Sequence, residues 1–225
     1  LYGLYEARAA MRAAKRAIIV EGYFDALRCF DVGIENVLAP CGTALTEQQA
    51  KLIRRYVPQV VVVFDGDAAG VQAAMRGLGL LVGVGLTVRA LVLPQGQDPD
   101  DYIKEHGAAA FRKLVDEAPD FVTFYARANA ERLDTIEGRT DVAQELFGVL
   151  ARVPDVMRLD EYLKRAAAVL RMDAHYCREQ YRLFLRQDRT WERARSKATP
   201  APRAQAVEDR NLVAVLLHNG VLLEL

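Results

Sequence analysis

Residues 60–64 restrict the possible folds of this chain more than any other stretch. Val60 to Phe64 are all apolar, and four of the five are β-branched valines. A strand that is apolar at every position is typical of a parallel sheet covered by helices on both faces. Asp65 follows directly, with Asp67 two residues later. The sequence therefore predicts an α/β fold in which a buried strand ends in acidic residues at one edge of the sheet.

Three further β-rich runs alternate with helical patterns in the same half of the chain. These runs lie at residues 17–20, 36–39 and 87–93. Helices are predicted at residues 5–16, 23–31, 46–56 and 67–82. Short strands that alternate with helices are typical of βαβ units. We therefore predict one parallel sheet flanked by helices.

The strand pattern stops near Gly96, and the rest of the chain is predicted to be helical. Apolar residues recur at helical spacing up to about residue 186, which favours several amphipathic helices in an all-α subdomain. The stretch that follows is polar and rich in Arg, Ala and Pro, as in flexible linkers. The predicted parts are a leading helix (1–16), a sheet domain (17–105), a helical subdomain (106–186), a linker (187–209) and the truncated start of a further domain (210–225).

The composition excludes several functional classes without selecting one. Thirty Lys and Arg balance thirty Asp and Glu, so contacts with nucleic acid would depend on local patches. No run approaches the roughly 20 apolar residues of a membrane span, and we expect no membrane partner. The three cysteines and three histidines are scattered, so neither a zinc site nor a disulfide framework is predicted. The first residue is leucine, and we expect the chain to be part of a longer protein.

Acidic residues follow three of the four predicted strands. The acidic turns are Glu21-Gly-Tyr-Phe-Asp25, Asp65-Gly-Asp67 and Asp98-Pro-Asp100. Neighbouring strands lie about 4.8 Å apart, and none of these turns contains a lysine or arginine. Crowded carboxylates oppose folding unless a cation binds between them, and all-oxygen ligand sets favour Mg²⁺ or Mn²⁺. We therefore predict a divalent metal site at this edge.

Two other interpretations account for single acids. Each acid could cap a helix or face its N-terminal dipole, and Asp101 is expected to do only that. Capping needs one acid per helix, however, whereas these turns contain pairs. A phospho-acceptor pocket with Asp65 as nucleophile would need a lysine after a later strand, and no lysine is present at that position.

The glycines of the acidic turns are consistent with the predicted metal site. Gly22 and Gly66 would allow sharp turns and the close approach of a phosphate.

The motifs taken together resemble those of bacterial DNA primases, which make RNA primers for replication. They are Leu1-Tyr-Gly-Leu4, Glu21-Gly-Tyr-Phe-Asp25, Cys41-Gly-Thr-Ala-Leu-Thr46, Asp65-Gly-Asp-Ala-Ala-Gly70 and Asp98-Pro-Asp100. A glutamate followed by Asp-x-Asp alone marks the wider Toprim group, which also contains topoisomerases and nucleases. The resemblance runs from residue 1 to about residue 186, and more weakly over residues 211–225.

This resemblance implies a Toprim-type parallel sheet followed by the helical subdomain of the RNA polymerase core. It makes Glu21, Asp65 and Asp67 the catalytic metal ligands. The further acidic positions around the metal are Asp25, Asp98 and Asp100, and the positions implied to lie beside the cofactor are Gly22, Gly42, Thr43 and Gly66. The implied metal is Mg²⁺ or Mn²⁺, and zinc would bind only in a domain outside this chain.

The implied activity is that of a DNA-directed RNA polymerase, which makes short RNA primers by magnesium-dependent nucleotidyl transfer. Its partners would be a single-stranded DNA template, ribonucleoside triphosphates, the RNA primer and a replicative helicase. The helicase would bind through the domain that begins near residue 210, and the protein would work in the bacterial cytoplasm at the nucleoid. We expect residues 1–225 alone to prime poorly, because most basic residues that grip the template would lie elsewhere.

Two alternatives stay open from the sequence. A Toprim nuclease would use the same acids on a phosphodiester. A non-catalytic protein that docks on the replicative helicase would retain the metal only for structure.

Overall fold

The computed structural model describes residues 1–40, 45–66, 71–94 and 96–198. The chain divides into two compact units, residues 1–185 and residues 186–225, and the first unit holds the sheet and the helices that cover it. Three predicted site residues, Gly42, Thr43 and Asp67, lie outside the described residues.

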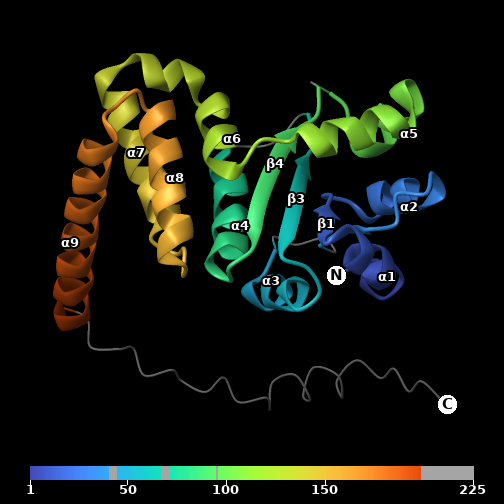
Figure 1. The fold of residues 1–225 in the computed structure, drawn as a ribbon, viewed down its shortest axis with the longest axis horizontal. Helices are drawn as coiled ribbons and strands as arrows, with labels where there is room; N and C mark the ends of the chain where they lie inside the picture. The colour runs from blue at the N-terminus through green and yellow to red at the C-terminus, as the bar shows by residue number, and fades with distance from the viewer. Residues whose placement is uncertain (41–44, 67–70, 95, 199–225) are drawn as a thin grey trace, which may run out of the picture. The chain divides into compact units, whose positions relative to one another are not determined.

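Strands and helices alternate in the first half of the chain, and helices alone follow (Figure 1). The strands are β1 (Arg16–Ile19), β2 (Val37–Leu38), β3 (Gln59–Phe64) and β4 (Thr87–Val92). The helices of this half are α1 (Leu4–Ala14), α2 (Tyr23–Asp31), α3 (Glu47–Arg54) and α4 (Val71–Gly83). After them come α5 (Pro99–Glu117), α6 (Phe121–Ala128), the 3₁₀ helix η1 (Ala130–Asp134), α7 (Ile136–Leu150), α8 (Val156–Val169) and α9 (Ala174–Ala198). The predicted α/β fold with a following helical part is confirmed.

All four strands form one parallel sheet in the order β2-β1-β3-β4. Ile19 of β1 lies opposite Val62 of β3, and Phe64 of β3 lies opposite Val92 of β4. Since every pair is parallel, the carboxyl ends of β1, β3 and β4 lie side by side. The turns that follow these three strands are the three acidic turns of the sequence.

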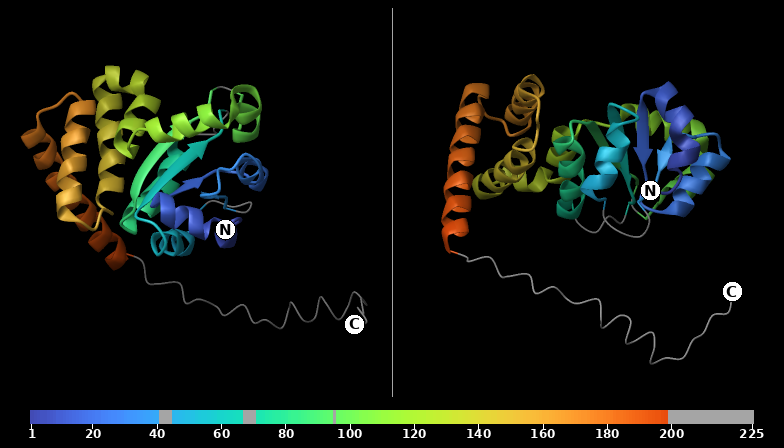
Figure 2. Two further views of the ribbon diagram at one scale, coloured as in Figure 1. Left: turned by 45° about the vertical axis from the view of Figure 1, so that its right-hand side comes forward. Right: turned by 90° about the horizontal axis from the view of Figure 1, so that it is seen from below.

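Residues of the central strand β3 point alternately to two buried cores, as expected for successive residues of a strand. Val60 and Val62 contribute to one core together with α1, α3, α4 and the later helices. Val61 and Val63 contribute to the other together with α2 and α5. Helices accordingly lie on both sides of the sheet (Figure 2). The uninterrupted apolar run predicted this two-sided burial.

The helices after α5 join the sheet through α6, which packs against β4. The ring of Phe124 stacks on that of Phe64, with 5.7 Å between the ring centroids. Asp120 caps α6 by accepting hydrogen bonds from the amides of Val122 and Thr123. The helical part therefore shares one hydrophobic core with the sheet domain.

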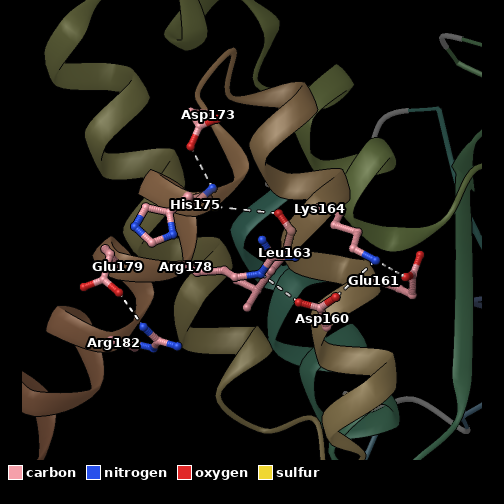
Figure 3. Close-up of polar contacts among 10 residues, drawn as sticks. Asp160, Glu161, Leu163, Lys164, Asp173, His175, Arg178, Glu179 and Arg182 are labelled. Atoms are coloured by element: carbon pink, nitrogen blue, oxygen red, sulfur yellow. Dashed lines mark hydrogen bonds and ion pairs between the residues drawn. The ribbon is translucent and has the colours of Figure 1, made fainter.

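An ion pair between Arg178 and Asp160 joins the start of α9 to α8 (Figure 3). Arg178 Nε of α9 donates to Asp160 Oδ1 of α8 at 2.7 Å, and Lys164 Nζ lies 3.1 Å from the other oxygen of Asp160. On the buried side of α9, the Cys177 thiol lies 3.7 Å from the Leu163 carbonyl oxygen. Burial raises the pKa of this thiol, so it stays protonated and acts as a small apolar group.

Helix α9 extends farther than the predicted helical part. It runs to Ala198, so the first half of the stretch expected to be a linker is helical. The physical reason is composition, since Arg, Gln, Glu, Lys and Ala have high helix propensity even where no apolar period is visible. The boundary between the two compact units nevertheless falls at residue 186, where the apolar pattern ends. Within the described residues, the helices include none long and apolar enough to cross a membrane.

Candidate metal site at the carboxyl edge of the sheet

Glu21 and Asp65 meet at the carboxyl ends of β1 and β3. The strand register places Glu21 two residues beyond Ile19, at the level of Phe64, and therefore next to Asp65. The Asp65 backbone N–H donates a hydrogen bond of 3.2 Å to Glu21 Oε1. Glu21 is exposed, whereas Asp65 Oδ1 is shielded from solvent. The structure thus brings together two of the three predicted catalytic acids.

The turn after β3 lies against the loop after β4. The Gly66 N–H donates to the Gln97 carbonyl oxygen at 2.8 Å. A side chain at position 66 would overlap the carbonyl oxygen of Pro94 and come within 2.9 Å of the Gly96 nitrogen. Glycine is therefore needed here for backbone packing. The hydrogen bond between Gly66 and Gln97 places the start of the third acidic turn, at Asp98, near Asp65.

Asp98 serves as the N-cap of α5. Its Oδ1 accepts a hydrogen bond of 2.8 Å from the Asp101 N–H. Capping had been expected of Asp101, but Asp101 supplies only the amide. Pro99 in the first turn lacks the N–H that a helix start leaves unused, so the Asp-Pro pair fits this position. The capping role leaves Asp98 fixed at the start of the helix.

Asp25 is a buried acid in the first turn of α2, with only 6% of its surface exposed. Its Oδ2 accepts a hydrogen bond of 3.0 Å from the Gly22 N–H. A Cβ at position 22 would lie 2.7 Å from that oxygen. Burial raises the pKa of Asp25, the Gly22 amide opposes this shift, and the charges of Asp98 and Asp100 add to it. The influence of those two acids means that the first and third acidic turns lie close together.

Asp100 differs from the other acids because two cations contact it. Arg28 Nε of α2 bonds its Oδ1, and Lys104 Nζ of α5 lies 2.5 Å from its Oδ2. Hydrogen bonds from Lys104 and Arg28 lower the pKa of Asp100. The sequence had suggested that the acidic turns lack neutralising residues. Here the neutralising residues come from the helices that follow these turns.

Arg28 and Lys104 are the residues that sequence reasoning missed. A weak signal was available, because each lies one helical turn from an acid of interest. Arg28 stands three positions after Asp25, and Lys104 stands four positions after Asp100. The contact between α2 and α5, which joins Arg28 to Asp100, depends on the tertiary fold.

The three acidic turns thus gather at one edge, but the complete predicted ligand set is not placed. Among the residues that the structure describes, which exclude Asp67, no three acidic, histidine or cysteine side chains form a metal-ligand group. The Asp65 amide contacts the Glu21 carboxylate, and the charges of Asp98 and Asp100 act on the buried carboxyl group of Asp25. The metal roles of all six acids stay predictions.

Comparisons with known proteins identify the family of this chain. A family model described as Toprim-like matches residues 18–103, and one described as the DnaB-helicase binding domain of primase matches residues 120–175. The DNA primase of Halalkalibacterium halodurans is 37% identical over 190 residues, which are 82% of this chain. The chain belongs to the bacterial DNA primase family. The DNA primase of Aquifex aeolicus is 42% identical over 134 residues, or 60% of this chain.

Solved primase structures share the fold. A DNA primase domain from Pseudomonas aeruginosa has a TM-score of 0.69 at 31% identity, over 81% of this chain and 59% of that one. The zinc-binding and RNA polymerase domains of the Aquifex aeolicus primase give a TM-score of 0.66 at 34% identity, over 78% of this chain and 42% of that one. The chain spans 31% and 27% of the two curated primases named above. The predicted family resemblance is confirmed for the part of a primase that this chain covers.

We expect Gly66→Ala to destabilise this primase chain by roughly 1–3 kcal/mol, because the new methyl group overlaps the Pro94 carbonyl. Urea unfolding followed by circular dichroism would measure the loss. Gly77→Ala is the matched control, because its Cβ would meet no atom within 4 Å, and alanine in a helix is favoured over glycine. Equal stability of the Gly66 variant and the unmodified chain would contradict the proposed packing.

We expect Asp25→Asn to stabilise the metal-free chain at neutral pH. The pKa of Asp25 is higher in the folded chain than its ordinary value, so the folded state binds the proton more tightly. That advantage is lost as the pH rises through the pKa of the folded chain. The unmodified chain should therefore lose stability relative to the variant as the pH increases from about 4 to 7. Thermal melts in a chelator would show this, with Asp141→Asn on the exposed side of α7 as the control.

Proposed function

We propose that this chain carries the metal-binding centre of a DNA primase, which makes RNA primers on single-stranded DNA by magnesium-dependent nucleotidyl transfer. The observation that carries this proposal is the contact between Glu21 and Asp65 at the carboxyl edge of the sheet. It is supported by the family assignment and by the similarity to a solved primase catalytic domain bound to single-stranded DNA.

The residues at this edge fit a hard divalent cation. Glu21 and Asp65 offer carboxylate oxygens, and Mg²⁺ and Mn²⁺ prefer such ligands. In the adjoining loop the amide oxygen Oε1 of Gln97 is buried, and no donor among the described residues reaches it. An oxygen of this kind suits a cation or a water bound to it. Glu21, Asp65 and Asp67 would hold the ion.

The chain's own residues would orient the reaction. When bound, the ion would supply positive charge to the phosphoryl oxygens and lower the pKa of the attacking 3′-hydroxyl. The Glu21 carboxylate accepts a hydrogen bond from the Asp65 backbone N–H, and this bond holds the Glu21 side chain beside the end of β3. Gly66 holds the turn of Asp65 against the loop after β4, so the acids are positioned before substrate binds. No protein nucleophile is required in such a transfer.

We expect Glu21→Gln and Asp65→Asn each to weaken Mn²⁺ binding at least tenfold, because a neutral amide is a poorer ligand than a carboxylate. Electron paramagnetic resonance of free Mn²⁺ would give the affinities. The control is Glu117→Gln, an exposed acid at the far end of α5. In the full-length primase, Asp65→Asn should abolish primer synthesis. If the unmodified protein cleaved nucleic acid with Mn²⁺ and incorporated no ribonucleotide, the nuclease alternative would replace this proposal.

We further propose that the helical part contacts a replicative helicase. The observation is the match of residues 120–175 to the helicase-binding family model. This stretch lies before the segment near residue 210 that the sequence resemblance implied. Within it, Val156 and Met157 at the start of α8 are adjacent apolar residues that are 78% and 83% exposed, so a partner that covered them would gain buried apolar surface.

Replacing Val156 and Met157 together by aspartate should reduce capture of a hexameric replicative helicase in a pull-down at least fivefold. The physical reason is that charges at an apolar contact must be desolvated without a partner. Tyr5→Asp, at a similarly exposed apolar residue outside the matched stretch, is the control. If deletion of residues 210–225 abolished capture and the double variant did not, the helicase would bind the C-terminal segment instead.

A further inference from the structure

One face of α1 alternates tyrosine rings with arginine side chains. Tyr5 is 73% exposed, and Arg8 Cζ lies 4.0 Å from the centre of its ring. One turn farther along the helix, Arg12 Cζ lies 5.5 Å from the ring centre of Tyr56, which follows the end of α3. Two cation–π pairs thus succeed one another along the helix. We call these four residues the aromatic–arginine face.

The position of this face follows from how α1 is attached to the sheet. Ala7 and Met11 are fully buried in the core that α1 shares with the sheet, so the other side of the helix is presented to solvent. Tyr5, Arg8 and Arg12 are three and four positions apart, which places them on one stripe of a helix. Arg8 Nε donates a hydrogen bond of 3.0 Å to the Tyr5 carbonyl oxygen and so stays beside the ring.

The positive charges on and around this face have no acidic partner among the described residues. Five basic residues of this region form no ion pair with a described carboxylate, namely Arg8, Arg12, Lys15, Arg54 and Arg55. Glu6, the acid in the first turn of α1, lies about 100° round the helix from Tyr5. The face therefore attracts an anionic ligand.

The helix dipole explains only some of these cations. Basic residues are favoured at the C-terminal end of a helix, and this accounts for Arg12 in α1 and Arg54 in α3. It does not account for Arg8, which stands in the first half of α1, or for the exposed ring of Tyr5 beside it. A single exposed aromatic residue is ordinary on a protein surface. The alternation of rings and guanidinium groups is what indicates a ligand.

Helix α1 begins at the edge of the sheet that carries the acidic turns. The Tyr2 N–H, just before the helix, donates 2.8 Å to the carbonyl oxygen of Ala39, which follows β2. The Tyr2 ring lies 6.0 Å from that of Tyr23, two residues after Glu21. The helix ends before Lys15, next to the start of β1 at the opposite edge. The aromatic–arginine face therefore leads away from the proposed metal site.

We propose that the aromatic–arginine face binds single-stranded nucleic acid on its way to or from the metal site, with a base stacked on Tyr5 and phosphates facing Arg8 and Arg12. Single strands bind where cations track the phosphates and aromatic rings accept the bases. Arg8 lies over one face of the Tyr5 ring, and the exposure of Tyr5 gives a base access to the ring. This inference rests on the proposed function, because that function brings a single strand to this edge of the sheet.

The competing occupant is another part of the full-length primase that packs on α1. A protein segment would have to bring several acidic groups to neutralise Arg8, Arg12 and their neighbours. A nucleic acid strand carries one negative charge at every nucleotide and a flat base beside it, so it matches both components of the face. The charge pattern and the exposed ring together favour the strand, and binding to the full-length enzyme separates the two occupants.

The test measures the binding of a fluorescently labelled oligothymidine by anisotropy, in a chelator and at several salt concentrations. The variants of residues 1–225 are the double variant Arg8→Gln with Arg12→Gln, and Tyr5→Ala and Tyr5→Phe. The matched charge control is Arg127→Gln with Arg152→Gln, since both arginines are exposed and lie outside the face. The aromatic control is Tyr176→Ala, at a tyrosine of α9 that is 54% exposed. Thermal melts verify that each variant is folded.

We expect the Arg8 and Arg12 double variant to bind at least tenfold more weakly. The slope of log affinity against log salt should fall by about 1.4, because each phosphate contact on a single strand contributes roughly 0.7. Tyr5→Ala should weaken binding at least fivefold with an unchanged slope, and Tyr5→Phe should stay within twofold because it retains the ring. Both controls should stay within twofold. Equal losses in the two double variants, or no binding by the unmodified chain, would overturn the proposal.

The full-length primase should lose oligothymidine affinity by similar factors in the same variants. A loss confined to residues 1–225 would mean that another part of the enzyme covers α1, and it would overturn the proposal. The use of a chelator keeps this test separate from the metal centre. If Asp65→Asn left Mn²⁺ binding unchanged, the proposed metal centre would fail while the oligonucleotide results stood. If Asp65→Asn lost Mn²⁺ and the Tyr5 and arginine variants bound normally, the aromatic–arginine face alone would fail.

Discussion

The parallel pairing of β1 with β3 is the constraint on which the candidate site depends. The register that sets Ile19 opposite Val62 brings Glu21 level with the end of β3, and the Asp65 amide then reaches the Glu21 carboxylate at 3.2 Å. A shift of one residue would turn every side chain of the buried strand to the opposite core. Such a shift would also draw either Gln59 or Asp65 into the apolar run of β3, so the burial of Val60 to Val63 in the two cores favours the register that leaves the two acids at the edge of the sheet.

Gathering acids at one edge creates electrostatic repulsion, and the structure offsets it in three ways. Backbone amides at the starts of turns and helices orient Glu21 and Asp98. Burial raises the pKa of Asp25, which favours its neutral form. The charge of Asp100 is offset by Arg28 and Lys104. The negative charge of each of these acids is therefore offset or avoided in a different way.

Much of this arrangement could be predicted because it depends on strand periodicity. The apolar run at residues 60–64 determines two-sided burial, and the position of each acid after a strand follows from parallel topology. The contacts of Asp100 could not be predicted, because Arg28 lies far from it in sequence and meets it only through the packing of α2 on α5. The extent of α9 was also missed, because helix propensity without apolar periodicity resembles a linker. The predicted third ligand, Asp67, lies outside the described residues.

The two glycines of the acidic turns connect the site to the stability of the fold. Both were expected to leave room for a phosphate, and at Gly66 the backbone packing by itself already requires glycine. A side chain at Gly22 would press on the Asp25 carboxylate, and one at Gly66 would overlap the Pro94 carbonyl. Each of the two turns therefore contains a glycine at a close contact, with the Asp25 carboxylate in one turn and with the Pro94 carbonyl in the other. In the proposed metal centre such contacts would position the acids before their ligands arrive, which is the condition under which fixed charges lower a reaction barrier most effectively.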